Sequence, residues 1–225
     1  MRINDLNIEE VVDLIVSYNT SICTFWSNSH GWAPKSAADL MSKSRLDWQI
    51  SLSHSLALWI QPTNQNQLAA LQILGYANLG ALIEGTMKLF LSVYYENYAI
   101  DIDAVTRKGD VQGPEVLNLE SLRQFFKRRI WSANPSDQWD SWINHIQYRR
   151  NAIHAFKSRE VGDLAGLHDD IRLYLRFLDR INGQLPYPDN NEGPTPSFDL
   201  RLSETWSYDA PVITPQRSGS HLGDQ

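Results

Sequence analysis

The stretch LGYANLGALIEGTMK, residues 74–88, decides the fold because it combines helical periodicity with three evenly spaced glycines. Apolar side chains in and around it recur with the period of an α-helix: Leu68, Leu71, Leu74, Leu82, Leu89 and Val93. Gly75, Gly80 and Gly85 occupy every fifth position, although a glycine inside a helix costs about 1 kcal/mol relative to alanine. Close approach of a neighbouring helix is the usual reason to tolerate that cost. We therefore expect a long, closely packed helix over about 64–98.

Helical periodicity also covers most of the remaining chain before Gly183. We predict further helices over five segments: about 7–27, 36–60, 118–131, 136–157 and 163–182. Residues 100–117 contain Gly and Pro and are predicted to form a polar loop. No long segment before Gly183 alternates with the period of two that a half-buried strand requires. The predicted fold class is all-α, with one helical bundle domain at residues 1–183.

Residues 184–225 differ from this domain in composition. They contain six of the ten prolines and no helical stripe. We predict an extended, Pro-rich C-terminal arm, in which roughly the last ten residues are disordered. The aromatic and apolar side chains of this arm are expected to pack on the bundle: Tyr187, Phe198, Leu200 and Trp206.

The charge of the chain is unevenly distributed. A net charge of −6 opposes general binding to nucleic acid, because such binding is driven by Lys and Arg. Residues 121–160, however, hold eight basic and three acidic side chains, a balance of +5, so the remainder sums to −11. One basic patch on an acidic protein suits a local anion site better than a long binding surface.

The single cysteine and the N-terminal sequence indicate where the protein resides. Cys23 cannot form an internal disulfide, and it lies in an apolar run that predicts a buried structural thiol. The N-terminus carries early acidic residues and no long apolar run, so no signal peptide is predicted. No segment reaches the roughly 18 uninterrupted apolar residues of a membrane-spanning helix. We expect a soluble, cytoplasmic protein without a membrane partner.

The segment YRRNAIHAF, residues 148–156, places polar groups at the end of an otherwise apolar helix. An arginine holds a phosphate by paired hydrogen bonds and keeps its charge, and Arg150 shares a helix face with His154. Histidine titrates near neutral pH and can move a proton to or from a ribose hydroxyl. These groups suffice for RNA transesterification with the 2′-hydroxyl as nucleophile. The alternative is a solvated helix end, where the helix dipole favours cations.

The sequence predicts neither a metal site nor another cofactor. His, Cys, Asp and Glu do not fall at the spacings of a closed zinc site. The nearest candidate is HDD at 168–170, whose adjacent side chains would point in different directions on a helix. His145 lies on a Trp-rich helix, where a packing or capping role is expected.

The polar segment resembles the signature of the HEPN superfamily, which comprises small helical-bundle proteins. Many members are metal-independent endoribonucleases of toxin–antitoxin, abortive-infection and CRISPR-associated systems. The signature is an Arg, four to six residues and a His at the end of a late helix, as in Arg149 and His154. A polar residue often follows the Arg, and Asn151 lies in this interval. Members also often carry an acidic residue on an earlier core helix, and Glu84 with Lys88 fits one such form.

Two features of the segment differ from the family pattern. Asn151 directly follows Arg150, and only three residues separate Arg150 from His154, so the family arginine is either Arg149 or Arg150. One toxin branch has a Tyr two residues after the His, where this chain has Phe156. The site implied by the resemblance has two parts: Arg149, His154 and Asn151 for catalysis, and Arg150, Lys157 and Glu84 for substrate binding.

The resemblance also implies that two copies of the chain combine their Arg and His residues in one cleft. We therefore expect a homodimer whose interface runs near residues 139–157. Aromatic side chains are frequent in and near this segment: Trp131, Trp139, Trp142 and Phe156. The function expected is RNA cleavage of the toxin or antiphage-defence type. One alternative is a non-catalytic HEPN-like subunit that binds a partner protein or antitoxin. The other is an unrelated helical protein with a solvated basic patch.

Overall fold

The computed structural model describes residues 5–61, 64–131, 138–156 and 158–188. These residues form helices and one two-stranded hairpin, which confirms the all-α class. The elements are α1 (Ile8–Ser27), α2 (Lys35–Lys43), α3 (Leu46–Trp59), α4 (Gln65–Val93), α5 (Tyr95–Ala99), β1 (Thr106–Arg107), β2 (Asp110–Val111), the 3₁₀ helix η2 (Pro114–Val116), α6 (Leu119–Arg129), α7 (Trp139–Arg150), the 3₁₀ helix η3 (Asn151–His154) and α8 (Leu164–Asn182).

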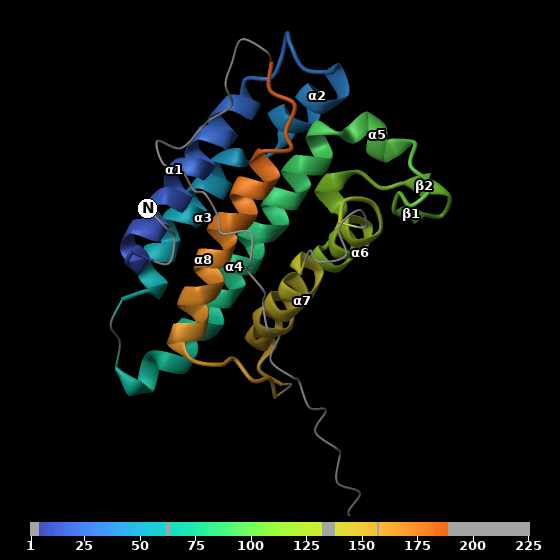
Figure 1. The fold of residues 1–225 in the computed structure, drawn as a ribbon. Helices are drawn as coiled ribbons and strands as arrows, with labels where there is room; N and C mark the ends of the chain where they lie inside the picture. The colour runs from blue at the N-terminus through green and yellow to red at the C-terminus, as the bar shows by residue number, and fades with distance from the viewer. Residues whose placement is uncertain (1–4, 62–63, 132–137, 157, 189–225) are drawn as a thin grey trace, which may run out of the picture.

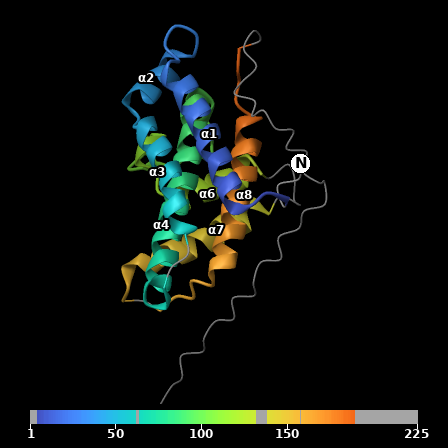
Figure 2. The ribbon, with the colours of Figure 1, turned by 90° about the vertical axis from the view of Figure 1, so that its left-hand side faces the viewer.

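Helix α4 lies at the centre of the bundle. It packs against α3, α7 and α8, while α1 packs on α3 and α8, and α6 packs on α7. Figure 1 shows α4 and α8 between the α1–α3 side and the α6–α7 side, and Figure 2 shows the same helices after a quarter turn. By length and composition alone α4 could cross a membrane, a test that core helices of soluble proteins also pass. Its packing on three sides is that of a core helix.

The three glycines of α4 lie where three other helices approach it. A Cβ atom added at any of them would come closer than 3.0 Å to a side chain, in each case from a different helix: Leu167 of α8 at Gly75 (2.7 Å), Arg150 of α7 at Gly80 (2.5 Å) and Gln49 of α3 at Gly85 (2.1 Å). The expected reason for these glycines is therefore confirmed. Close approach outweighs the loss of helix propensity at all three positions.

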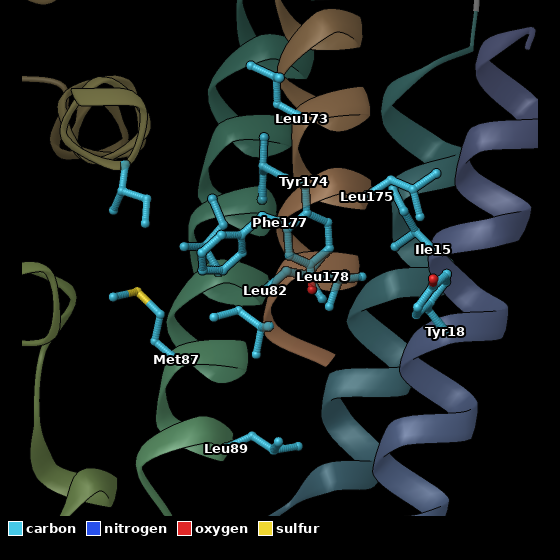
Figure 3. Packing of buried hydrophobic residues seen from close by; sticks show 14 of the residues in the cluster. Ile15, Tyr18, Leu82, Met87, Leu89, Leu173, Tyr174, Leu175, Phe177 and Leu178 are labelled. Atoms are coloured by element: carbon cyan, nitrogen blue, oxygen red, sulfur yellow. The ribbon is translucent and has the colours of Figure 1, made fainter. Parts of the chain in front are cut away.

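The core combines aromatic and aliphatic side chains with one buried polar cluster. Figure 3 shows side chains of α1, α4 and α8 meeting in this core. The Gln49 side-chain amide donates to the Leu82 carbonyl at 2.9 Å and also lies within hydrogen-bond distance of Thr86 and Tyr174. The amide is thus satisfied inside the bundle. Cys23 is buried as expected, and burial raises the pKa of its thiol to about 12.

Three helix boundaries differ from the prediction. The segment 36–60 forms two helices, because Ser44 is extended and its hydroxyl donates to the Leu40 carbonyl. The segment 64–98 is interrupted at Tyr94, whose hydroxyl donates to the Gln184 carbonyl. In the segment 136–157 the α-helix ends at Arg150 and continues as the 3₁₀ turn η3. None of these three boundaries is marked by a Gly or Pro.

The loop after α5 contains the small hairpin of β1 and β2, which the sequence did not predict. Lys108 and Gly109 have positive φ values of 55° and 92°, as a tight hairpin turn between paired strands requires. The carboxylate of Asp101 holds the loop to α6 through Arg129 at 2.8 Å, and Asp103 lies 3.3 Å from Arg128.

The first residues of the predicted arm pack on the bundle. The Tyr187 ring lies 5.0 Å from the Phe25 ring and 5.7 Å from the Trp26 ring, and its hydroxyl donates to the Asn182 side chain at 2.5 Å. The expected contact of Tyr187 is therefore confirmed. The other predicted contacts, of Phe198, Leu200 and Trp206, lie outside the described residues.

Replacing Gly85 by alanine should destabilise the bundle. The new Cβ would lie 2.1 Å from Oε1 of Gln49, a buried and hydrogen-bonded side chain. Overpacking typically costs about 1–3 kcal/mol, which exceeds the gain of about 1 kcal/mol in helix propensity. We expect urea denaturation to show a net loss of about 1 kcal/mol. Gly183→Ala, where the nearest atom is 3.4 Å from the new Cβ, is the control. Equal stability of both variants would contradict this account.

Candidate functional site

The candidate site lies where α7 ends and the chain tightens into η3. Along most of α7 the side chains face the core, including Trp142, Ile143 and Ile146. Arg149 and Arg150 then occupy the last α-helical turn, and η3 follows directly. Because residues in a helix are offset by about 100°, consecutive arginines point in different directions. The structure therefore separates the two arginines that the sequence could not distinguish.

Arg149 points into the bundle, and its side chain is only 14% exposed. Its Nη1 atom donates to the hydroxyl of Tyr76 on α4 and lies 3.6 Å from Oδ2 of Asp170 on α8. The guanidinium also lies against Gly162, where an added Cβ would be 2.6 Å from Nη2. The φ value of Gly162 is +81°, so both its conformation and this contact favour glycine.

Asp170 is a buried carboxylate that connects three helices. Its Oδ1 accepts from Trp142 Nε1 at 2.9 Å, and its Oδ2 accepts from the Tyr76 hydroxyl at 2.9 Å. His145 Nε2 lies 3.3 Å from the same Oδ2 atom. His145 is buried, which agrees with the packing role expected from the sequence. The predicted site did not include Tyr76 or Asp170.

Arg150 lies nearer the surface, with its side chain 32% exposed. Its Nη1 atom donates to Oε2 of Glu84 at 2.8 Å, and Lys88 binds the other oxygen of Glu84 at 2.9 Å. The aliphatic part of Arg150 crosses α4 at Gly80. Two of the residues that the resemblance assigns to substrate binding, Glu84 and Arg150, are thus in contact. Burial raises the pKa of Glu84, but hydrogen bonds from Arg150 and Lys88 outweigh it and hold the pKa below 4.5.

The turn η3 carries the exposed part of the site. His154 is exposed, and its imidazole makes no hydrogen bond or ion pair with any described residue. Asn151 is half-buried, and residues three apart lie on the same side of a 3₁₀ helix, so it shares a face with His154. Ile153 is half exposed and Phe156 fully exposed, which leaves apolar surface beside the imidazole. Lys157, a predicted substrate-binding residue, lies outside the described residues.

Ion pairing reduces the charge of the basic patch predicted at residues 121–160. On α6, Arg123 and Lys127 both bind Asp140, at 2.6 Å and 2.9 Å. The next two basic residues of α6 bind the acidic loop after α5, as described above. The local excess of positive charge in the sequence is therefore balanced in space by acids, some of them distant in sequence. Arg159 differs, since its guanidinium stacks over the Tyr148 ring at 4.9 Å.

The aromatic residues that motivated a dimer interface have a different role. Trp131, Trp139 and Trp142 are all buried within one copy of the chain. These tryptophans therefore fill the core and do not support an interface near α7. Phe156 is the exception, because it is exposed.

Metal ligands do not cluster in the part of the chain that the structure describes. No group of three or more His, Cys, Asp and Glu side chains there could hold a metal ion. In the HDD segment at 168–170, Asp170 already accepts hydrogen bonds from Tyr76 and Trp142 in the core. His168 is partly buried, and burial lowers its pKa below 6.5.

Comparison of the chain with protein-family models, curated proteins and solved structures found no match. The resemblance to the HEPN superfamily thus depends on the residues of the Arg-x4-His segment and on Glu84 with Lys88.

The contact of Glu84 predicts a specific dependence of stability on pH. Because the pKa of Glu84 is lowered in the folded state, its carboxylate stabilises the fold above its unfolded value of 4.5. This contribution is lost as the pH falls through the lowered pKa. Glu84→Gln should lower the free energy of unfolding by about 1–2 kcal/mol at neutral pH. When the pH then falls below 4.5, the variant should lose less stability than the wild type, because it has no carboxylate at this position to protonate. Urea denaturation between pH 3 and pH 7 would measure this, with Glu9→Gln at an exposed position of α1 as control. Parallel curves for Glu84→Gln and wild type would refute it.

Proposed function

We propose that the protein is a metal-independent endoribonuclease of the toxin or antiphage-defence type, which acts in the cytoplasm. The main supporting observation is the geometry at the end of α7: Arg150 is held by Glu84 from α4, and His154 stands exposed four residues further on. The contact supports the proposal, because the HEPN resemblance implies an acidic residue on an earlier core helix near the late-helix motif. The reaction is transesterification, in which the 2′-hydroxyl of RNA attacks the adjacent phosphate.

Each residue has a role that its chemistry permits. The guanidinium groups of the site bind the scissile phosphate and its developing negative charge. His154 acts as the general base or acid, because histidine is the residue that most often transfers a proton to or from a reacting group. Asn151, on the same side of η3, positions the phosphate or the imidazole. Glu84 orients Arg150, and Lys157 contributes to RNA binding.

Two copies of the chain would complete this site. A single Arg–His pair holds a phosphate from one side only, and the resemblance implies a composite cleft. Ile153 and Phe156 provide exposed apolar surface beside His154, which a second copy can cover. The proposed interface therefore centres on η3 and not on the tryptophans of α7.

A second candidate function is that of a non-catalytic HEPN-like subunit that binds a protein partner. The observation favouring it is the pairing of both arginines with acidic residues of the same chain, Arg149 with Asp170 and Arg150 with Glu84. In this interpretation the ion pairs stabilise the end of α7, and the exposed apolar side chains of η3 contact the partner. The remaining alternative is a helical protein unrelated to the HEPN superfamily. Ion pairs within the chain are also compatible with that alternative.

Substitution of His154 tests whether the site is catalytic. With pure protein, RNA and EDTA, His154→Ala should cleave 10²–10⁴ times more slowly, as is typical of a general acid or base. Because His154 is exposed, the free energy of unfolding of the His154→Ala variant should stay within about 1 kcal/mol of wild type. His54→Ala, an exposed histidine of α3, is the matched control and should cleave normally. Cleavage that is unchanged in His154→Ala, or that needs Mg²⁺, would end the proposal.

The products provide an independent check of the mechanism. Attack by the 2′-hydroxyl leaves a 2′,3′-cyclic phosphate or 3′-phosphate and a free 5′-hydroxyl, and DNA should not be cut. Mass spectrometry of a cleaved oligonucleotide distinguishes these ends from the 5′-phosphates of most metal-dependent nucleases.

The dimer can be tested by sedimentation at micromolar concentration. We expect the wild type to sediment as a dimer and Phe156→Asp to sediment as a monomer, because a charge would replace exposed apolar surface at the proposed interface. Ile102→Asp, a similarly exposed position in the loop after α5, is the control. A monodisperse wild-type monomer would contradict the composite site.

A further inference from the structure

Asp170 is a buried carboxylate whose position beside Arg149 the proposed mechanism does not use. It accepts one hydrogen bond from α7, through Trp142, and one from α4, through Tyr76. A buried carboxylate requires such compensation, because an unpaired charge in the core is costly. These hydrogen bonds hold the Asp170 carboxylate in one position, and the carboxylate in turn restrains the Arg149 guanidinium beside it.

The Tyr76 hydroxyl bridges Asp170 and Arg149. This hydroxyl donates to Oδ2 of Asp170 and accepts from Nη1 of Arg149, so both of its hydrogen bonds have a defined direction. Burial, together with the charge of Asp170, raises the pKa of the phenol well above its usual value, so it keeps the proton that it donates. The Tyr76 ring also lies beneath the guanidinium, 5.0 Å from its central carbon.

Two glycines also lie against the guanidinium, Gly162 in the loop before α8 and Gly166 in the first turn of α8. Gly162 leaves room for Nη2, which an alanine side chain would meet at 2.6 Å, and Gly166 leaves room for Nη1 at 3.4 Å. The guanidinium thus lies against the Tyr76 ring and against two positions where a larger side chain would meet it. Its side chain still retains 14% exposure at the end of α7.

We propose that Asp170 and Tyr76 are positioning residues that hold the Arg149 guanidinium in a fixed orientation for an RNA phosphate at the end of α7. The inference rests on the proposed function for its ligand, and on the contacts of Arg149 for its geometry. Donors that are fixed before the ligand arrives bind an oxyanion without paying for reorganisation, which is how positioned groups contribute to binding and catalysis. In this arrangement Arg149 and Arg150 approach the phosphate from different directions, each held by its own carboxylate.

The test compares two buried tyrosines that differ in whether they contact the arginine. Tyr76→Phe removes the bridging hydroxyl, and Asp170→Asn removes the charge. Tyr174→Phe is the matched control, because Tyr174 is also fully buried and its hydroxyl bonds to other residues than Arg149: Thr86 at 3.1 Å, and Gln49 and Asn19 at 3.4 Å. The first readout is the rate of hydrogen exchange of the Arg149 side-chain N–H groups by NMR. The second is the dissociation constant for an all-2′-O-methyl oligonucleotide, which has no free 2′-hydroxyl and is not cleaved.

We expect Tyr76→Phe to raise the exchange rate at least tenfold and to weaken oligonucleotide binding at least fivefold, with Tyr174→Phe within twofold of wild type in both. Asp170→Asn, where it folds, should behave as Tyr76→Phe. Faster exchange with unchanged binding, or equal effects in both tyrosine variants, would overturn the inference. If wild type does not bind the oligonucleotide, the proposed function and the phosphate role of Arg149 both fail. If Arg149 then exchanges slowly in the wild type and fast in Tyr76→Phe, Tyr76 still fixes the orientation of the guanidinium, but not for RNA binding.

Discussion

Close approach to α4 is the constraint on which the rest of the structure depends. Three helices reach its backbone at Gly75, Gly80 and Gly85, and each contact would be blocked by a single methyl group. The approach of α7 at Gly80 has a chemical consequence, because it brings Arg150 across α4 towards Glu84 one turn further along. The candidate site is therefore built by the same packing that forms the core.

Two carboxylates divide the adjacent arginines between opposite environments. Asp170 draws Arg149 into the bundle, while Glu84 holds Arg150 nearer the surface. The arrangement stabilises the end of α7, where the chain changes from an α-helix to a 3₁₀ turn, and it leaves His154 exposed beyond both ion pairs. Catalysis and partner binding would use this surface differently, but both depend on α7 ending at this position.

The sequence predicted the helices well where local chemistry determines them. Asn7 caps α1 through a reciprocal hydrogen bond with Glu10, and Asp163 caps α8 through the Gly166 amide. The breaks at Ser44 and Tyr94 were missed, because neither residue by itself excludes a helix. The Ser44 hydroxyl donates to the Leu40 carbonyl one turn earlier, and the Tyr94 hydroxyl makes a tertiary contact with the Gln184 carbonyl. In the site, the resemblance to the HEPN superfamily named Glu84, which contacts Arg150. The contribution of Asp170 could not be read from the sequence, since it depends on how α8 is rotated against two other helices.

The five-residue spacing of the glycines has a consequence for how this chain tolerates changes in length. Five residues turn an α-helix by about 500°, so successive glycines face directions about 140° apart and together surround the helix. One residue inserted between Gly75 and Gly85 would rotate one end by about 100° relative to the other, so that α3 and α8 could no longer both meet a glycine. Homologues of this chain should therefore vary in length in the hairpin loop after α5 and keep the interval within α4 constant.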